Sequence, residues 1–301
     1  MSALRIFVTG RDGQIARSLR EAAAGADDIA IGFGARPSFD LTQPDAIAPA
    51  IEAFAPDLVV NAAAYTAVDR AESEPQLAFA INRDGAAAVA AAAAKIGAAV
   101  IQLSTDYVFD GAKPSPYVET DPTSPQSIYG QSKLEGEQAV AAAAPRHIVL
   151  RTSWVYAPFG GNFVRTMLRL AGEQERLRVV DDQIGCPTYA PDIAAAILSI
   201  GRRIRAEGWR ESYAGVTHLA GPDAVSWCAF ARRIVAGSGG GCVPVDAIGA
   251  ADWPTPARRP ANSRLSSERL ATLFGVRLPP LDTSLNRCLA SLREAPAGDR
   301  T

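Results

Sequence analysis

The stretch of sequence that decides the fold is Leu4-Arg-Ile-Phe-Val-Thr-Gly-Arg-Asp-Gly-Gln-Ile-Ala16. Residues 4–8 predict a short buried strand because they are mostly apolar, and the residues after Gly13 have the spacing of a helix. A glycine-rich turn between a strand and a helix lets a pyrophosphate approach the N–H groups at the helix N-terminus. The turn therefore predicts a Rossmann-type dinucleotide site at Gly10, Arg11, Asp12, Gly13, Gln14 and Ile15.

The remaining sequence alternates apolar runs with helical patterns, which is typical of a mostly parallel sheet. Further strands are expected at residues 29–33, 58–61, 99–103, 148–152 and 178–180, and near Thr217. Helices are expected after Gly13, at residues 46–54, 75–96, 127–144, 191–205 and 227–236, and as two short segments near the end.

This order of elements predicts an α/β fold, a Rossmann-type doubly wound parallel sheet with a smaller C-terminal α/β lobe for a substrate. We expect residues 1–152 to form the dinucleotide-binding domain, together with a returning strand near residues 176–186. Residues 153–301 should form mainly the substrate-binding lobe, with the chain crossing between the two parts.

Composition excludes several classes of protein. With 301 residues, of which 48% are apolar, the chain can bury a large core. The net charge is −2 and no basic block occurs, so we expect neither nucleic acid nor an anionic membrane as a partner. No apolar run is long enough to span a bilayer and no signal peptide is visible, which predicts a cytoplasmic location.

The cysteines and histidines predict neither a metal site nor a disulfide framework. The two histidines, His147 and His218, are expected to be structural residues in strands. With so few histidines, a serine–histidine–aspartate catalytic triad is not expected. The cysteines are scattered without a Cys-x-x-Cys pair, and they are Cys186, Cys228, Cys242 and Cys288.

The segment Tyr129-Gly-Gln-Ser-Lys133, in the helix expected at 127–144, suggests an acid–base pair. Residues four apart on a helix project from one face about a turn apart. A phenol with an ordinary pKa near ~10 becomes a useful acid or base at neutral pH when a nearby cation stabilises its phenolate. The pattern occurs by chance in many proteins, and its weight here comes from the glycine turn and from Ser104-Thr105-Asp106.

Four motifs together resemble the extended short-chain dehydrogenase/reductase family. They are Thr9-Gly-x-x-Gly-x-x-Ala16, Asn61-Ala-Ala-Ala-Tyr-Thr-Ala-Val-Asp69, Ser104-Thr-Asp-Tyr-Val-Phe-Asp-Gly111 and Tyr129-x-x-x-Lys133. Three further runs are similar to the branch that reduces the 4-keto group of dTDP-4-dehydro-L-rhamnose to give dTDP-L-rhamnose. These runs are Arg151-Thr-Ser-Trp-Val-Tyr156, Asp182-Gln-Ile-Gly-Cys-Pro-Thr188 and Pro254-Thr-Pro-Ala-Arg-Arg-Pro-Ala-Asn-Ser263, so the resemblance covers nearly the whole chain.

The resemblance implies roles for the catalytic residues. Tyr129 donates a proton to the developing alkoxide while a reduced nicotinamide delivers hydride to the sugar carbonyl. Lys133 binds the nicotinamide ribose and lowers the pKa of Tyr129, and Thr105 hydrogen-bonds the substrate oxygen. Asp106 positions the sugar. The alternative for Thr105 and Asp106 is a polar strand end that caps a turn.

The resemblance also implies binding residues outside the catalytic group. Trp154 packs on the sugar or the thymine, or it is an ordinary core aromatic. Arg259, beside Arg258 in a proline-constrained loop, binds the diphosphate through its fork-shaped guanidinium, or it is solvated surface. The residues implied for the adenine and pyrophosphate are Asp40, Leu41, Ala62, Ala63, Ala64 and Tyr65.

Two departures from the family pattern bear on cofactor and metal. The expected second strand ends in Ile31-Gly-Phe-Gly-Ala-Arg36 and lacks the carboxylate that binds the ribose 2′-OH of NAD. With Arg11 and Arg36 close in sequence, NADPH is the expected cofactor and NADH an alternative. Some members are dimers that hold magnesium through glutamates. Ser18 stands at one such position, so no metal is expected and the protein should be a monomer or a weak homodimer.

Two other functions remain open on the same fold. One is a nucleotide-sugar 4,6-dehydratase or epimerase, but dehydratases have an Asp-Glu pair after the threonine, whereas this chain has Asp106-Tyr107. The other is a non-catalytic, dinucleotide-binding regulatory subunit of the methionine adenosyltransferase type. The presence of Thr105, Tyr129 and Lys133 favours the reductase over both.

Overall fold

The computed structural model describes residues 3–239 and 243–294. Its centre is a six-stranded sheet in the order β10-β5-β4-β3-β1-β2, with every neighbouring pair parallel. The strands are β1 (Leu4–Thr9), β2 (Ile29–Gly34), β3 (Leu58–Asn61), β4 (Ala99–Thr105), β5 (His147–Thr152) and β10 (Gly215–His218). The predicted doubly wound α/β fold is confirmed.

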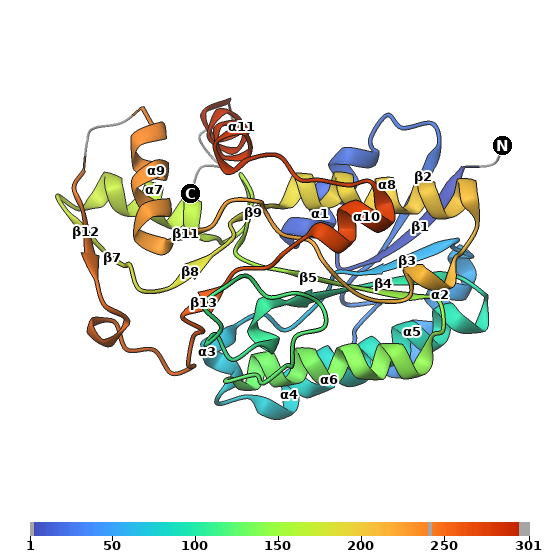
Figure 1. Ribbon diagram of the computed structural model, residues 1–301. Helices are drawn as coiled ribbons and strands as arrows, with labels where there is room; N and C mark the ends of the chain where they lie inside the picture. Colours follow the sequence, from blue (N-terminus) through green and yellow to red (C-terminus); the bar gives the residue numbers. More distant parts are fainter. Residues whose placement is uncertain (1–2, 240–242, 295–301) are drawn as a thin grey trace.

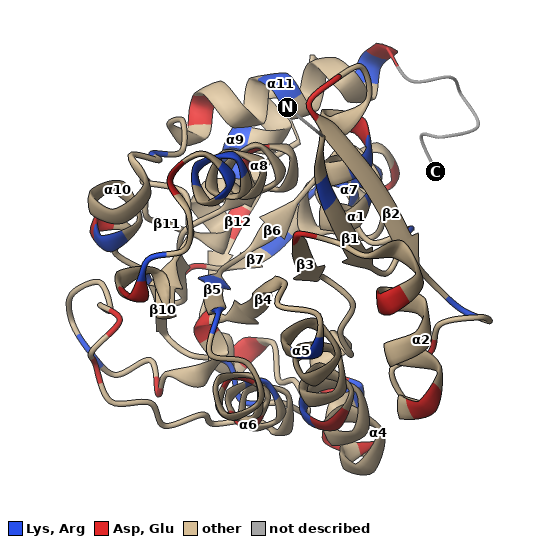
Figure 2. Ribbon diagram, turned by 90° about the vertical axis from the view of Figure 1, so that its right-hand side faces the viewer, with Lys and Arg blue, Asp and Glu red and all other residues tan. Residues whose placement is uncertain are grey.

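Helices cover both faces of this sheet (Figures 1 and 2). Side chains along β1 alternate between the two faces, because Ile6 and Val8 belong to one buried cluster and Phe7 to the other. The first face carries α1 (Gln14–Ala23), α8 (Ala190–Glu207) and α10 (Glu268–Phe274). The second carries α2 (Pro44–Phe54), α5 (Ala86–Lys95) and α6 (Ile128–Ala143).

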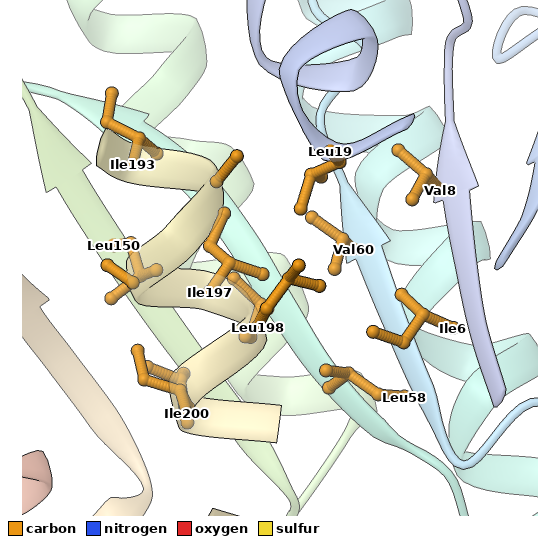
Figure 3. Close-up of a cluster of buried hydrophobic side chains, with 14 of the residues drawn as sticks. Ile6, Val8, Leu19, Leu58, Val60, Leu150, Ile193, Ile197, Leu198 and Ile200 are labelled. Carbon is orange, nitrogen blue, oxygen red and sulfur yellow. The ribbon is translucent and has the colours of Figure 1, made fainter. Parts of the chain in front are cut away.

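The larger cluster shows how α8 docks on the sheet. Figure 3 shows Ile193 and Ile197 of α8 beside Leu150 of β5, with Ile6 and Val60 further along the sheet. All five side chains are fully buried. Removal of such a side chain from water contributes roughly 1.5–3 kcal/mol of stability. The helix α8, which comes late in the sequence, therefore stabilises a sheet built mostly from the first half of the chain.

The expected helix at 75–96 is divided into three parts. It consists of α4 (Pro75–Phe79), the π-helical turn η1 (Ala80–Gly85) and α5, and a short helix, α3 (Val68–Ala71), precedes it. Here α6 comes close, since a Cβ at Gly136 would lie 2.0 Å from the carbonyl oxygen of Asn82. The π turn therefore brings the Asn82 backbone against a helix that only a glycine lets approach so closely.

The second lobe is built from short strands and three longer helices (left in Figure 1). Its core contains Tyr156, Phe230 and Leu285. The helices are α7 (Phe163–Glu173), α9 (Trp227–Gly237) and α11 (Leu281–Glu294). The strands are β6 (Val155–Tyr156), β7 (Leu177–Val180), β8 (Ile184–Gly185), β9 (Thr188–Tyr189), β11 (Val225–Ser226), β12 (Val245–Ile248) and β13 (Asn262–Ser263). Single turns of 3₁₀-helix are η2 (Asp106–Val108), η3 (Glu211–Tyr213) and η4 (Ala250–Asp252).

The expectation of a returning strand near residues 176–186 was wrong. Within that range β7 pairs with β12, and β8 pairs with β11 and β13, all outside the main sheet. The strand that returns to the sheet is β10, beside β5. Short apolar runs do not reveal their partners, because pairing is decided by tertiary packing. The helix α7 was also not expected, and the division into domains 1–152 and 153–301 stays a prediction.

The described residues bear on two of the compositional expectations. Within residues 3–239 and 243–294, no helix is both long and apolar enough to cross a membrane. Cys186, Cys228 and Cys288 are buried free thiols, whereas Cys242 lies outside the described residues. His147 begins β5 and His218 ends β10, as expected of structural residues.

Candidate active site

The glycine turn lies at the carboxyl edge of the sheet, between β1 and α1. Gly10 has φ +81°, a conformation that favours glycine, and its N–H donates to the carbonyl of Gly34 at 2.7 Å. Gly13 caps α1 without a side-chain acceptor for the first N–H groups. Because β2 lies on one side of β1 and β3 on the other, this is the switch point where such sheets bind ligands.

A chain of buried polar side chains connects the glycine turn to the middle of the sheet. The Thr9 hydroxyl donates to Asn61 Oδ1 at 2.6 Å, and Asn61 Nδ2 donates to Gln102 Oε1 at 2.7 Å. Gln102 Nε2 then donates to the carbonyl of Leu103 at 3.0 Å. Buried polar groups that satisfy each other in this way hold the ends of β1, β3 and β4 in fixed positions.

The residues expected along the pyrophosphate lie beside these hydrogen-bonded side chains. The Ala63 N–H donates to Thr9 Oγ1 at 3.0 Å, and a Cβ at Gly10 would lie 3.5 Å from the Cβ of Ala63. The backbone of Tyr65 is held by Asn82, which accepts from its N–H at 2.8 Å and donates to its carbonyl at 3.1 Å. The segment Ala62, Ala63, Ala64 and Tyr65 therefore lines the edge next to Gly10.

The other expected cofactor residues have varied surroundings. Asp40 accepts hydrogen bonds from the N–H and hydroxyl of Thr42, which lower the pKa of its carboxyl. Leu41 is buried. Arg11 and Asp12 are exposed, and Arg11 Nε lies 3.4 Å from Asp12 Oδ1. Gln14 Oε1 is buried without a hydrogen-bond partner. Ile15 packs partly buried against the core at the start of α1.

The helix α6 delivers Tyr129 to the ends of β4 and η2. The Ser127 hydroxyl caps α6 by accepting from the Gly130 N–H at 3.1 Å. A Cβ at residue 130 would lie 2.3 Å from the carbonyl oxygen of Tyr107, so the glycine permits this close approach. The Thr105 side chain lies close enough to Tyr129 to lower the pKa of its phenol. The structure therefore brings together the residues expected for proton donation.

The ionisation of Tyr129 differs from the sequence expectation. Burial raises the pKa of Tyr129 to about 12, Asp106 acts in the same direction, and Thr105 opposes them only in part. Burial therefore dominates this shift over the lowering expected from Lys133, whose Nζ donates to the carbonyl of Leu103 at 2.6 Å. Burial also lowers the pKa of Lys133 to about 8. Tyr129 is thus a protonated phenol at neutral pH, as a proton donor must be.

Asp106 is a buried carboxyl group with one unused oxygen. Its Oδ1 accepts from Thr105 Oγ1 at 3.0 Å, while Oδ2 is buried without a partner. Burial raises its pKa to about 6, although hydrogen bonds from Ser263 and Thr105 oppose the shift. An unsatisfied buried oxygen is costly, and a substrate hydroxyl would satisfy it.

An ion pair brings the C-terminal loop to the same edge. Arg259 donates to both carboxylate oxygens of Asp69, at 3.1 and 2.9 Å. Arg259 also interacts electrostatically with Tyr107, whose ring lies edge-on to Tyr129 with the centroids 5.6 Å apart. Arg258, by contrast, contacts Gln126 at 3.3 Å on the surface. The pair therefore connects the catalytic group to the second lobe.

Trp154 packs in the second lobe. Its ring stacks on Trp227 with the centroids 3.4 Å apart, and it packs against the second-lobe core. Its φ of +47° is unusual for a residue other than glycine, and a Cβ at Gly185 would overlap its ring. The structure supports the core-aromatic alternative, while the substrate contact of Trp154 stays a prediction.

Sequence reasoning missed four buried residues around the site: Asn82, Gln102, Glu137 and Arg151. Asn82 and Gln102 hold the backbone next to the cofactor turn, and Glu137 and Arg151 form an ion pair below Lys133. Polar residues inside apolar runs were the available signal, since a buried polar side chain needs a partner.

The position discussed for magnesium is occupied by a hydrogen-bonded serine. Ser18 is buried, and its hydroxyl donates to the carbonyl of Gln14 at 2.7 Å. Among the residues that the structure describes, no group of three or more histidine, cysteine, aspartate or glutamate side chains could hold a metal ion.

Comparisons with known proteins assign a family. Residues 4–294 match the family described as RmlD substrate binding domain. The chain is 51% identical over 292 residues to a dTDP-4-dehydrorhamnose reductase of Sinorhizobium fredii, covering 96% of this chain and 98% of that protein. It is 44% identical over 299 residues to a protein of the same name from Burkholderia thailandensis, covering 96% and 99%.

A solved structure agrees with these relatives. The crystal structure of dTDP-4-dehydrorhamnose reductase from Bacillus anthracis, in complex with NADP, matches with a TM-score of 0.90 at 33% identity. The match covers 97% of this chain and 100% of that chain. The chain therefore belongs to the RmlD family.

Proposed function

We propose that this protein is an NADPH-dependent oxidoreductase that reduces the 4-keto group of dTDP-4-dehydro-L-rhamnose to give dTDP-L-rhamnose. The observation that carries the proposal is the group of Tyr129, which is partly buried, and the buried Thr105 and Asp106 at the sheet edge. Relatives 51% and 44% identical over nearly their full lengths have the name of this reductase, which supports the same substrate here.

The chemistry of the residues fits a dinucleotide at the glycine turn. Gly10 has the positive φ that a tight turn needs, and the first N–H groups of α1 are not capped by a side chain. A reduced nicotinamide dinucleotide supplies the hydride when bound there. The segment from Ile31 to Arg36 carries no carboxylate, and Arg11 and Arg36 lie near it in sequence, which favours a 2′-phosphate and hence NADPH.

The residues of this chain would handle the proton and the developing charge. Tyr129 holds its proton at neutral pH and donates it to the sugar oxygen as negative charge develops there. Thr105 hydrogen-bonds the same oxygen. Lys133 holds the nicotinamide ribose, and its positive charge stabilises the phenolate left on Tyr129 after the proton has moved.

Asp106 and residues of the second lobe would hold the rest of the substrate. The unpaired Oδ2 of Asp106 is an acceptor for a sugar hydroxyl. Arg259 presents a planar fork suited to the diphosphate, and Asp69 keeps that fork oriented toward Tyr107 and Tyr129. Trp154 would contact the sugar or the thymine at the margin of the site.

The alternative functions have less support. Tyr107 stands where a 4,6-dehydratase needs a glutamate. Burial raises the pKa of its phenol, so at neutral pH it stays protonated and does not act as the base that the glutamate would be. A regulatory subunit without turnover has no need of a protonated tyrosine beside a buried threonine. We further propose a cytoplasmic enzyme that is a monomer or a weak homodimer, which size-exclusion chromatography at several concentrations would test.

The decisive experiment follows NADPH oxidation and product together. With dTDP-4-dehydro-L-rhamnose, one NADPH should be consumed for each dTDP-L-rhamnose formed, over many turnovers per enzyme molecule. NADPH should serve at least as well as NADH. Product formed without net NADPH consumption would point to a dehydratase or epimerase. Tightly bound NADPH with no product from a panel of nucleotide 4-keto-sugars would point to the regulatory function.

A further inference from the structure

The face of α6 that carries Lys133 also carries a second buried charge. Glu137 lies one helical turn beyond Lys133, so the two side chains are neighbours on that face. Each residue is only 4% exposed. A carboxylate buried next to a buried ammonium is unusual enough to require a physical reason.

Two successive residues of β4 anchor these two side chains. The carbonyl of Leu103 accepts from Lys133 Nζ at 2.6 Å, and the hydroxyl of the next residue, Ser104, donates to Glu137 Oε1. Two residues one turn apart on α6 therefore bind two consecutive residues of β4. The contacts fix the position of α6 against β4 at the level of the lysine.

Arg151 on β5 holds the carboxylate from the other side. Its Nε donates to Glu137 Oε1 at 2.9 Å, and its Nη2 donates to Oε2 at 2.6 Å. With Ser104, the carboxylate accepts three hydrogen bonds from donors on two neighbouring strands. This bidentate pair occupies both oxygens and prevents the side chain from turning. The Lys133 ammonium is left to the Leu103 carbonyl and to a ligand.

A buried ammonium tends to lose its proton, because low dielectric disfavours the charged form. Burial lowers the pKa of Lys133 to about 8, and the nearby carboxylate of Glu137 opposes that effect. The other charged and titratable groups on elements packed against α6 have partners of their own: Asp69 and Tyr107 with Arg259, Arg70 with Glu74, Arg83 with Asp84 and Glu135, Lys95 with Glu52, Asp106 with Thr105, and His147 with the carbonyl of Ala144.

We propose that Glu137 is a positioning residue that keeps the buried Lys133 side chain charged and in place, while Ser104 and Arg151 hold the Glu137 carboxylate. The inference rests on the proposed roles of Lys133 and Tyr129. A charged lysine binds the ribose hydroxyls as a donor of three hydrogen bonds and stabilises the tyrosine anion. A neutral lysine donates fewer hydrogen bonds to the ribose and has no charge to stabilise the tyrosine anion.

The composition of the chain makes a direct test practical. The protein has three lysines, Lys95, Lys113 and Lys133. In protein labelled with ¹³C at the lysine ε-carbon, NMR titration follows each amine separately, and Lys133→Met identifies the signal of interest. We expect the pKa of Lys133 to be about 8 in the wild type and roughly one unit lower or more in Glu137→Gln.

A matched control lies on the same helix. Glu135 pairs with Arg83 at 3.1 Å and is partly exposed. Glu135→Gln removes the same charge and should leave the Lys133 titration unchanged. A Lys133 pKa in Glu137→Gln within about 0.2 units of the wild type would overturn the inference. It would leave the proposed function intact, since that depends on NADPH oxidation by the wild type.

A pH profile separates this role from a merely structural one. The rate parameter kcat/KM should fall at alkaline pH as Lys133 loses its proton, and in Glu137→Gln this fall should begin about one pH unit lower. A structural defect would lower kcat/KM equally at every pH, and that result would contradict the inference. Glu137→Asp retains a charge and should restore part of the shift.

A double variant covers a failure of Glu137→Gln to fold. Removal of the carboxylate alone leaves Arg151 buried without its partner, which is costly. The combination of Glu137→Gln with Arg151→Gln removes both charges and allows an amide–amide contact. We expect the pKa of Lys133 to stay below the wild-type value, because Glu137 is the charge that acts on it. A wild-type titration in this double variant would also overturn the inference.

Discussion

The two sides of the site are held by different kinds of structure. On the cofactor side, buried side chains of three long parallel strands hydrogen-bond one another, from Thr9 through Asn61 to Gln102. On the substrate side, Trp154 lies in the turn between β5 and β6, and Arg259 lies in the loop before β13. Arg259 reaches the site through its ion pair with Asp69. The first side has its shape fixed by the sheet, whereas the second depends on a few contacts between distant segments.

This difference has a consequence for mutations. A change on the sheet side should alter the chemical step and leave the affinity for the sugar nearly unchanged, because the scaffold stays in place. A change on the loop side should alter the affinity for the sugar and leave cofactor binding unchanged. The following predictions test that separation.

The largest effect is expected for Tyr129→Phe. Loss of the proton donor should lower kcat by about a hundredfold or more, with the dissociation constant for NADPH nearly unchanged. Stopped-flow kinetics and fluorescence titration with NADPH measure the two quantities. Tyr107→Phe is the control, since its ring touches Tyr129 edge-on and should cost less than threefold. A kcat for Tyr129→Phe within threefold of the wild type would remove this residue from proton transfer.

The next effect is expected for Arg259→Met. Loss of a charge-assisted contact of about 1.5–3 kcal/mol should lower kcat/KM for the sugar roughly 10- to 100-fold, mainly through KM. The affinity for NADPH should not change. Arg258→Met removes the neighbouring, surface guanidinium and should have little effect. Equal losses in the two variants would mean that the loop acts through its overall charge.

A smaller effect is expected where the two sides meet, at Asp106, which contacts Thr105 and Ser263. Because its folded-state pKa is raised to about 6, the folded protein loses stability as pH rises from about 4 to about 6, and the full loss is present above that range. Asp106→Asn should therefore raise stability by about 3 kcal/mol at pH 8, and the gain should vanish below about pH 4.

Thermal unfolding of Asp106→Asn and the wild type at pH 8 and pH 4 checks this sign. The same variant should turn over the sugar more slowly, because an amide replaces the carboxylate acceptor. A lower Tm for the variant at pH 8 would show that the carboxylate is stabilised by a contact that the burial does not reveal.

The smallest effect is expected for metal removal. The Ser18 hydroxyl is already bonded to the carbonyl of Gln14, so a chelator should leave both activity and Tm unchanged. Added magnesium should also have no effect. A rise in Tm with magnesium would indicate a metal site formed by other residues or between subunits.

The sequence predicted the parts of the molecule that follow from local patterns. The strand, glycine turn and helix around Gly10 lie where they were expected, because each depends on neighbouring residues. Tyr129 and Thr105 meet because both lie at the ends of regular elements whose order fixes their position. The roles assigned to these residues stay predictions.

Features that depend on distant contacts could not be predicted. The segment at 177–180 looked like a strand of the main sheet, but its partner is β12, far along the chain. Nothing in the local pattern distinguishes such partners. Burial, which also depends on distant contacts, raises the pKa of Tyr129, whereas the spacing to Lys133 predicted a lowered value. Nothing in the local pattern marks Glu137 as buried, because its partner Arg151 lies on another element, β5.

The position of β10 has a consequence for how the protein is made. The six-stranded sheet is completed by residues 215–218, so β5 lacks one neighbour until the ribosome has passed His218. At ~5–20 residues per second, that interval lasts several seconds. Throughout it, the edge of β5 and the apolar face that α8 will cover remain open to other chains. A recombinant fragment that ends at residue 152 would keep both surfaces open permanently, and we expect it to aggregate rather than fold.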